Sequence, residues 1–79
     1  MNSQAHHFNI YLRPETEGGY TVIVPALPGC VTYGKTVAEA REMAGDAIGA
    51  YLESMADHGE SVVADTDALL TSIDIPLRA

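Results

Sequence analysis

A complete set of helix signals between Thr36 and Gly59 constrains the fold of this chain more than any other feature. Thr36 followed by Glu39 forms a capping box, in which each side chain satisfies an unpaired backbone N–H at the start of a helix. Gly59 is a typical C-terminal stop, because glycine adopts the left-handed conformation at little cost. We therefore predict one helix from Val37 to about Asp57.

The predicted helix has a single apolar face. At about 100° per residue, the apolar side chains of this segment gather on one arc. The members of this core face are Val37, Ala40, Ala44, Ile48, Tyr51, Leu52 and Met55. Because positions 40 and 44 are small, the helix can lie close to a sheet.

Three short strands are expected before the helix. Residues 7 to 13 alternate between apolar and polar side chains, as a strand with one buried face does. The glycine pair at 18–19 supplies the positive φ of a hairpin loop, and residues 20 to 24 form a second strand. Two prolines in the segment 25–28 end the pairing because proline has no N–H, and residues 31 to 33 make a short third strand.

A fourth strand is expected after the helix. Residues 71 to 77 alternate again, with Ile73, Ile75 and Leu77 predicted to point inward, and Pro76 suggests an edge position. A right-handed crossover through the helix would set this strand parallel to the first one. The sequence thus predicts a single α+β domain over residues 1–79 in the order β-β-β-α-β, with an antiparallel three-stranded sheet, a parallel fourth strand and residues 1–5 disordered.

The charge balance points away from nucleic acids. The chain has four basic and eleven acidic residues, a net charge of −7, whereas binding to phosphates requires clustered cations. An acidic surface favours encounter with a basic protein. We find no apolar run of the roughly 20 residues that span a bilayer and no signal segment, so a cytosolic location without membrane contact is expected.

The acidic residues of the predicted helix are concentrated opposite its core face. They are Glu39, Glu42, Asp46, Glu53 and Asp57. Two interpretations remain open: a solvated helix face, or a docking stripe for a basic protein that would relieve the repulsion between like charges. A divalent-metal nuclease is disfavoured, because its carboxylates must converge on one point and these are spread along the helix.

The other reactive side chains favour structural roles. Cys30 is the single cysteine, and no neighbouring base would activate its thiol. The three histidines, at positions 6, 7 and 58, are not arranged to chelate, since adjacent strand residues point to opposite faces. We therefore predict no catalytic residue, no metal site and no cofactor, and hence no enzymatic activity.

One apolar surface lacks a covering element. Tyr11, Thr21 and Ile23 share the side of the sheet that a single helix on the other side cannot cover. Such a face indicates a second protein layer. We predict that a second copy of the chain covers it, in a homodimer or homotetramer, and a different protein is the alternative.

The middle of the chain contains an ordered set of residues: Gly18-Gly19-Tyr20, Val24-Pro25, Leu27-Pro28-Gly29-Cys30, Gly34, Thr36 and Glu39-Ala40. This set resembles the signature of HicB-like antitoxins. The resemblance implies a partial ribonuclease-H-like fold and a small basic partner, a HicA-type mRNA-cleaving toxin whose active-site histidine would be covered. It also implies that Leu27, Pro28 and Gly29 lie near the toxin-facing surface, and we add Glu39, Glu42 and Asp46 as candidate toxin contacts.

Two departures from the family pattern qualify this resemblance. Many HicB proteins carry a C-terminal DNA-binding module, and none is expected here, so direct binding to operator DNA is not predicted. The connection from residue 60 to 70 also lacks the prolines expected there. The alternative function is an orphan, self-associating interaction domain without a toxin partner.

Overall fold

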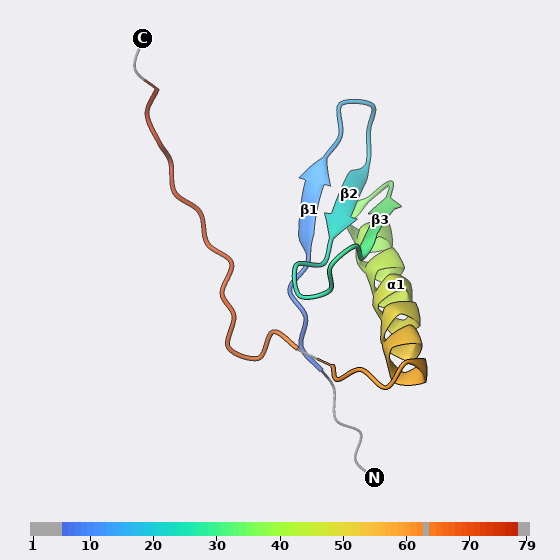
Figure 1. Ribbon diagram of the computed structural model, residues 1–79. Helices are drawn as coiled ribbons and strands as arrows, with labels where there is room; N and C mark the ends of the chain where they lie inside the picture. Colours follow the sequence, from blue (N-terminus) through green and yellow to red (C-terminus); the bar gives the residue numbers. More distant parts are fainter. Residues whose placement is uncertain (1–5, 63, 78–79) are drawn as a thin grey trace.

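A three-stranded antiparallel sheet and one long helix form the body of the protein (Figure 1). The computed structural model describes residues 6–62 and 64–77, and the predicted disorder of residues 1–5 lies outside them. The strands are β1 (Tyr11–Pro14), β2 (Tyr20–Ile23) and β3 (Val31–Gly34), and the helix is α1 (Val37–Asp57). Their order in the sheet is β1-β2-β3, and α1 lies across one face.

The loops between the strands follow the glycine signals. Gly18 and Gly19 have φ values of 104° and 80°, which confirms the positive φ predicted for the hairpin loop. The proline-rich elbow between β2 and β3, residues 25–29, is closed by backbone hydrogen bonds, with the N–H of Val24 donating to Cys30 O at 3.1 Å and that of Cys30 to Leu27 O at 2.9 Å. The elbow is therefore an ordered turn that packs as a unit.

The helix begins and ends where the sequence predicted. Thr36 Oγ1 accepts from the N–H of Glu39 at 3.0 Å, and Glu39 Oε1 accepts from the N–H of Lys35 at 2.6 Å. The glutamate thus reaches one residue further back than the standard capping box. Gly59, with φ 69°, follows the helix end.

Two small clusters of buried side chains make up the core. Val22, Ala40 and Ala44 form the first, between the sheet and the first half of α1. The second cluster lies between the elbow and the second half of α1; its buried members are Val24, Leu27 and Cys30. The predicted core face of α1 is confirmed except at Val37, which is 50% exposed.

The first strand is shorter than predicted. Strand pairing covers Tyr11–Pro14 and not residues 7–10, although Phe8 and Ile10 still pack against the core. The register explains this. Tyr11 lies opposite Ile23, so continued pairing would set residue 9 opposite Pro25, which has no N–H to donate.

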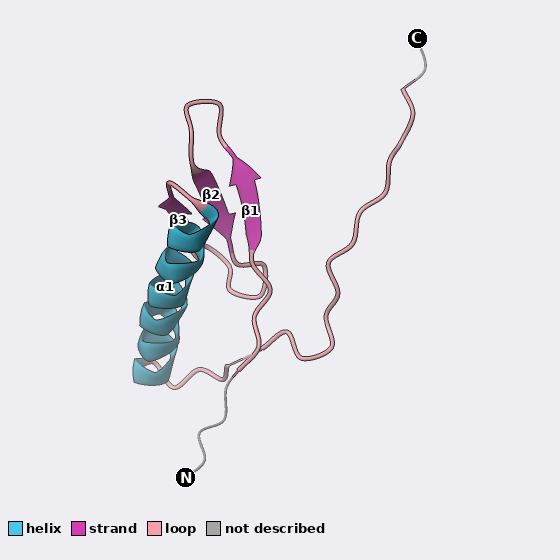
Figure 2. Cartoon of the chain, turned by 180° about the vertical axis from the view of Figure 1, so that it is seen from behind, coloured by secondary structure: helices cyan, strands magenta, loops and turns pink. Residues whose placement is uncertain are grey.

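The segment after α1 differs most from expectation. Residues 71–77 are extended but form no strand with the described residues, and Ile73, Ile75 and Leu77 are exposed instead of facing inward. Figures 1 and 2 show this segment leaving the body on the β1 side, in roughly the direction of β1. A parallel fourth strand is thus not formed within the described part of a single chain.

Candidate protein-binding surfaces

The sheet face that α1 leaves open carries a row of apolar side chains. Because successive strand residues point to opposite faces, Val22 faces the helix and its neighbours Thr21 and Ile23 face away. The register sets Tyr11 and Val31 on either side of Ile23. The predicted set of Tyr11, Thr21 and Ile23 is therefore brought together.

Two members of the open sheet face were missed by the sequence reasoning. Val31 and Tyr33 lie beside Ile23 and Thr21, and both are exposed. Their membership depends on the register between β2 and β3, which the elbow sets. Pairing residues of β2 with residues of β3 outward from the elbow would have identified Val31 and Tyr33, because an antiparallel register fixes which residues share a face.

A polar network borders the open sheet face. Thr21 Oγ1 donates to Glu15 Oε2 at 2.6 Å, and Arg13 Nε lies 3.5 Å from the same oxygen. The hydrogen bond from Thr21, helped by Arg13, holds the pKa of the Glu15 carboxyl below its ordinary value of 4.5. This network fixes the hairpin loop against β2.

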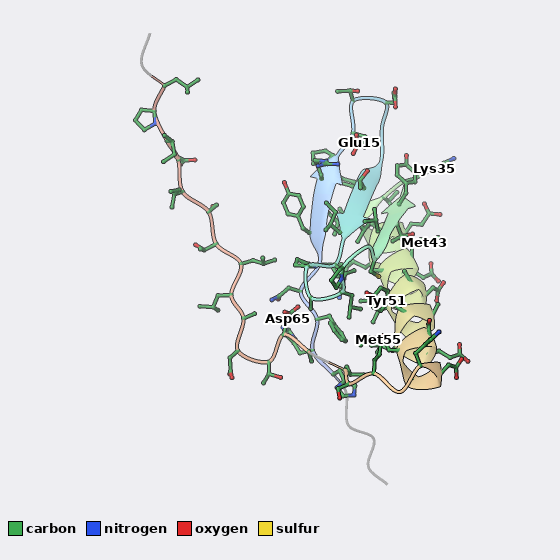
Figure 3. All side chains as sticks on the ribbon, in the orientation of Figure 1. Glu15, Lys35, Met43, Tyr51, Met55 and Asp65 are labelled. Atoms are coloured by element: carbon green, nitrogen blue, oxygen red, sulfur yellow. The ribbon has the colours of Figure 1, made fainter. Side chains whose placement is uncertain are left out.

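The surface of the elbow consists of Pro28, Gly29 and backbone atoms, whereas Leu27 points into the core. The Leu27 side chain is buried, 2% exposed, and packs against Val24 and Cys30, so it cannot touch a partner directly. Pro28 and Gly29 are exposed. Tyr51 of α1 donates its hydroxyl to Pro28 O at 2.8 Å, which ties the elbow to the core side of the helix (Figure 3).

The carboxylates of α1 form an exposed acidic stripe, made up of Glu42, Asp46, Glu53 and Asp57. None of them forms an ion pair with another described residue. The ion pair found among the described residues joins Arg13 and Glu15. Glu39, included in the predicted set, is engaged at the helix start. Glu42 and Asp46 lie on the side of α1 opposite Tyr51, so they do not join the elbow in one patch.

The remaining reactive groups have structural surroundings. Burial raises the pKa of the Cys30 thiol, which disfavours its nucleophilic thiolate form. His58 Nδ1 lies 2.8 Å from the carbonyl oxygen of Ser54 at the end of α1. In residues 6–62 and 64–77 no three potential ligands gather as a metal site, and no helix there combines the length and apolar character of a membrane span.

These features describe a small α+β domain with surfaces suited to binding other proteins. Residues 8–75 match the HicB-like antitoxins of bacterial toxin–antitoxin systems. Since the match covers most of the sequence, the chain belongs to the HicB-like antitoxin family.

UPF0150 proteins from several organisms are similar to this chain. A UPF0150 protein of Thermoplasma acidophilum is 41% identical over 64 residues, which cover 81% of this chain and 93% of the relative. A UPF0150 protein of Synechocystis is 38% identical over 56 residues, 70% of this chain and 71% of the relative. A third, from Archaeoglobus fulgidus, is 44% identical over 46 residues, 58% of this chain and 67% of the relative.

Proposed function

We propose that this protein is an antitoxin that binds a HicA-type mRNA-cleaving toxin and neutralises it by covering its active site. Membership of the HicB-like antitoxin family is the observation that carries the proposal. The chain itself performs no chemistry in this account, and it acts in the cytoplasm.

The acidic stripe is the proposed electrostatic contact for the toxin. Its four carboxylates are exposed and unpaired within the described residues, so a basic partner would relieve their mutual repulsion. Pro28 and Gly29 of the elbow are a second, separate contact. With a net charge of −7, direct binding to nucleic acid is disfavoured.

Charge reversal tests the contact at the acidic stripe. Glu42→Lys/Asp46→Lys is compared with Glu17→Lys/Glu60→Lys, which makes the same change in net charge at exposed positions outside the stripe. We expect the first pair to slow association with the toxin roughly tenfold at low salt and to flatten its salt dependence. Equal association rates for the two double variants would rule out the stripe as the contact.

Self-association belongs to the same proposal. The open sheet face of Tyr11, Thr21 and Ile23 is the proposed interface between copies, and residues 71–77 are the proposed fourth strand of the partial ribonuclease-H-like arrangement. The exposed apolar row across β1, β2 and β3 supports the interface.

An orphan self-associating domain is the second candidate, and the same open sheet face favours it. The genomic neighbourhood separates the two. An adjacent reading frame for a small lysine-rich protein with one key histidine supports the antitoxin. Co-expression should then relieve growth arrest by that protein and yield a complex on purification, whereas an orphan domain would do neither.

A further inference from the structure

The extended tail after Ala68 is fixed at its root. The N–H of Asp65 donates to His7 O at 2.7 Å, and the Asp65 carboxylate accepts from the N–H of Asn9 at 2.9 Å (Figure 3). The amide of Asn9 also lies 3.4 Å from Ala68 O. The chain between α1 and the tail is therefore attached to the segment that precedes β1.

Beyond Ala68 the tail, residues 69–77, is apolar and uncovered. Ile73 is 78% exposed and Leu77 94% exposed, and Leu69, Leu70 and Ile75 are exposed as well. Ile73, Ile75 and Leu77 alternate with Ser72, Asp74 and Pro76, so one side of an extended tail would be formed by large aliphatic side chains. The family match reaches residue 75, which makes most of this tail part of the shared domain.

A groove beside β1 is suited to receive such side chains. α1 packs mainly over β3 and β2, and it leaves a groove of about 400 Å³ against the segment before β1. Its lining is mixed: Phe8, Ile10, Ala44 and Ile48 supply apolar contacts, and His6 and Arg41 add polar groups. An apolar cavity of about 150 Å³ holds a benzene ring, so this groove has room for two aliphatic side chains.

The edge of the sheet beside this groove is also free. β1 is an edge strand, and no strand of residues 6–62 and 64–77 pairs with its outer side. An unpaired edge is a template for an added strand. Groove and edge together offer both side-chain and backbone contacts.

The tail is poorly placed to fill its own groove. Its root lies beside Asn9 and it runs in roughly the same direction as β1. Continued residue by residue from that contact, it would set Ile75 and Leu77 beside the polar hairpin loop, residues 15–18, and past the groove. A tail from another molecule is not bound to that register.

We propose that two copies of this chain exchange their tails. Each tail lies along β1 of the other copy as a fourth strand, with Ile73, Ile75 and Leu77 directed at the groove. The exchange is reciprocal, as expected for a two-fold symmetric dimer. It rests on the fourth strand of the proposed function, and it does not require a toxin.

The first test is the mass of the full-length protein in solution. We expect a dimer of 8.4 kDa chains, with a dissociation constant raised at least about a hundredfold by Ile75→Lys, because a cation would be placed against the apolar side chains of the groove and close to Arg41, which also lines it. The matched control, Ser72→Lys, places the same charge on the opposite side of the tail and should leave the dimer intact. Both variants also carry Ile23→Lys, which removes the open sheet face as an alternative interface, and equal dimer masses for the two would overturn the exchange.

The second test identifies the occupant of the groove in the wild-type protein. In a dimer mixed from differently labelled chains, isotope-filtered NMR should show contacts from the Ile73 and Ile75 methyl groups of one chain to Phe8 and Ile48 of the other. Contacts only within a chain would contradict the exchange while retaining the fourth strand. A tail without contacts, or one ordered only by added toxin, would contradict both the exchange and the self-contained strand, and the antitoxin proposal would be unaffected.

Discussion

Gly34 shows how one residue sets the distance between the two layers. A Cβ atom at this position would lie well inside van der Waals contact of the backbone N and Cα of Ala40. Backbone atoms of a helix cannot move aside as a flexible side chain can. The glycine at the end of β3 therefore permits the close crossing of strand and helix that buries Ala40 completely.

We expect Gly34→Ala to lower the free energy of unfolding by about 1–3 kcal/mol, the usual cost of overpacking. Urea denaturation followed by circular dichroism measures it. Gly49→Ala is the control: a Cβ there meets nothing within 4 Å, and the change should add about 1 kcal/mol of helix stability. A Gly34→Ala protein as stable as the wild type would show that the layers are not in tight contact.

The hydrogen bond from Thr21 to Glu15 predicts a pH effect at residue scale. Because the pKa of Glu15 is below 4.5 in the folded protein, the folded state binds fewer protons than the unfolded state. The resulting stabilisation is present above pH 4.5 and is lost as the pH falls through the folded-state pKa. We expect Thr21→Val to raise the Glu15 pKa toward its ordinary value in an NMR titration, and an unchanged pKa would contradict the assignment.

At the scale of elements, the helix bounds and the three-stranded antiparallel sheet were predictable, whereas the extent of strand pairing was not. The bounds of α1 follow from Thr36, Glu39 and Gly59, which act within a few residues of the helix ends. The length of β1 depends instead on where β2 reaches Pro25, a contact between distant parts of the chain. The membership of the open sheet face also depends on distant pairing, because only the register between β2 and β3 places Val31 and Tyr33 on it.

The helix cap gives the prediction at this scale. Thr36→Ala removes the acceptor of the Glu39 N–H and should lower the free energy of unfolding by about 1 kcal/mol. Thr36→Ser retains the acceptor and should remain within a few tenths of a kcal/mol of the wild type. Thermal or urea unfolding distinguishes them, and equal losses for both variants would show that the hydroxyl is not the stabilising group.

At the scale of the whole molecule, the described chain leaves two apolar surfaces uncovered, the open sheet face and the tail. The open sheet face and the tail lie on different parts of the fold. Alternation identified the apolar residues of the tail, but the sequence of one chain does not say which molecule covers them. The strand or surface that would pair with the proposed fourth strand is therefore beyond what a single-chain pattern can locate.

Ile23→Lys tests the open sheet face as an interface. Ile23 is at the centre of the apolar row, so a lysine there should reduce the oligomeric mass measured by light scattering or weaken binding to the toxin. Thr16→Lys, in the exposed hairpin loop, is the matched control and should change neither. If Ile23→Lys also leaves mass and toxin binding intact, this face is not an interface.

The most direct measurement of the central claim is a titration of the ribonuclease activity of the proposed HicA-type toxin with this purified protein. We predict a stoichiometric fall in RNA cleavage to the background rate, with no cleavage by this protein alone. Full toxin activity at a large excess of this protein, or RNA cleavage by the protein itself, would contradict a function of binding and covering.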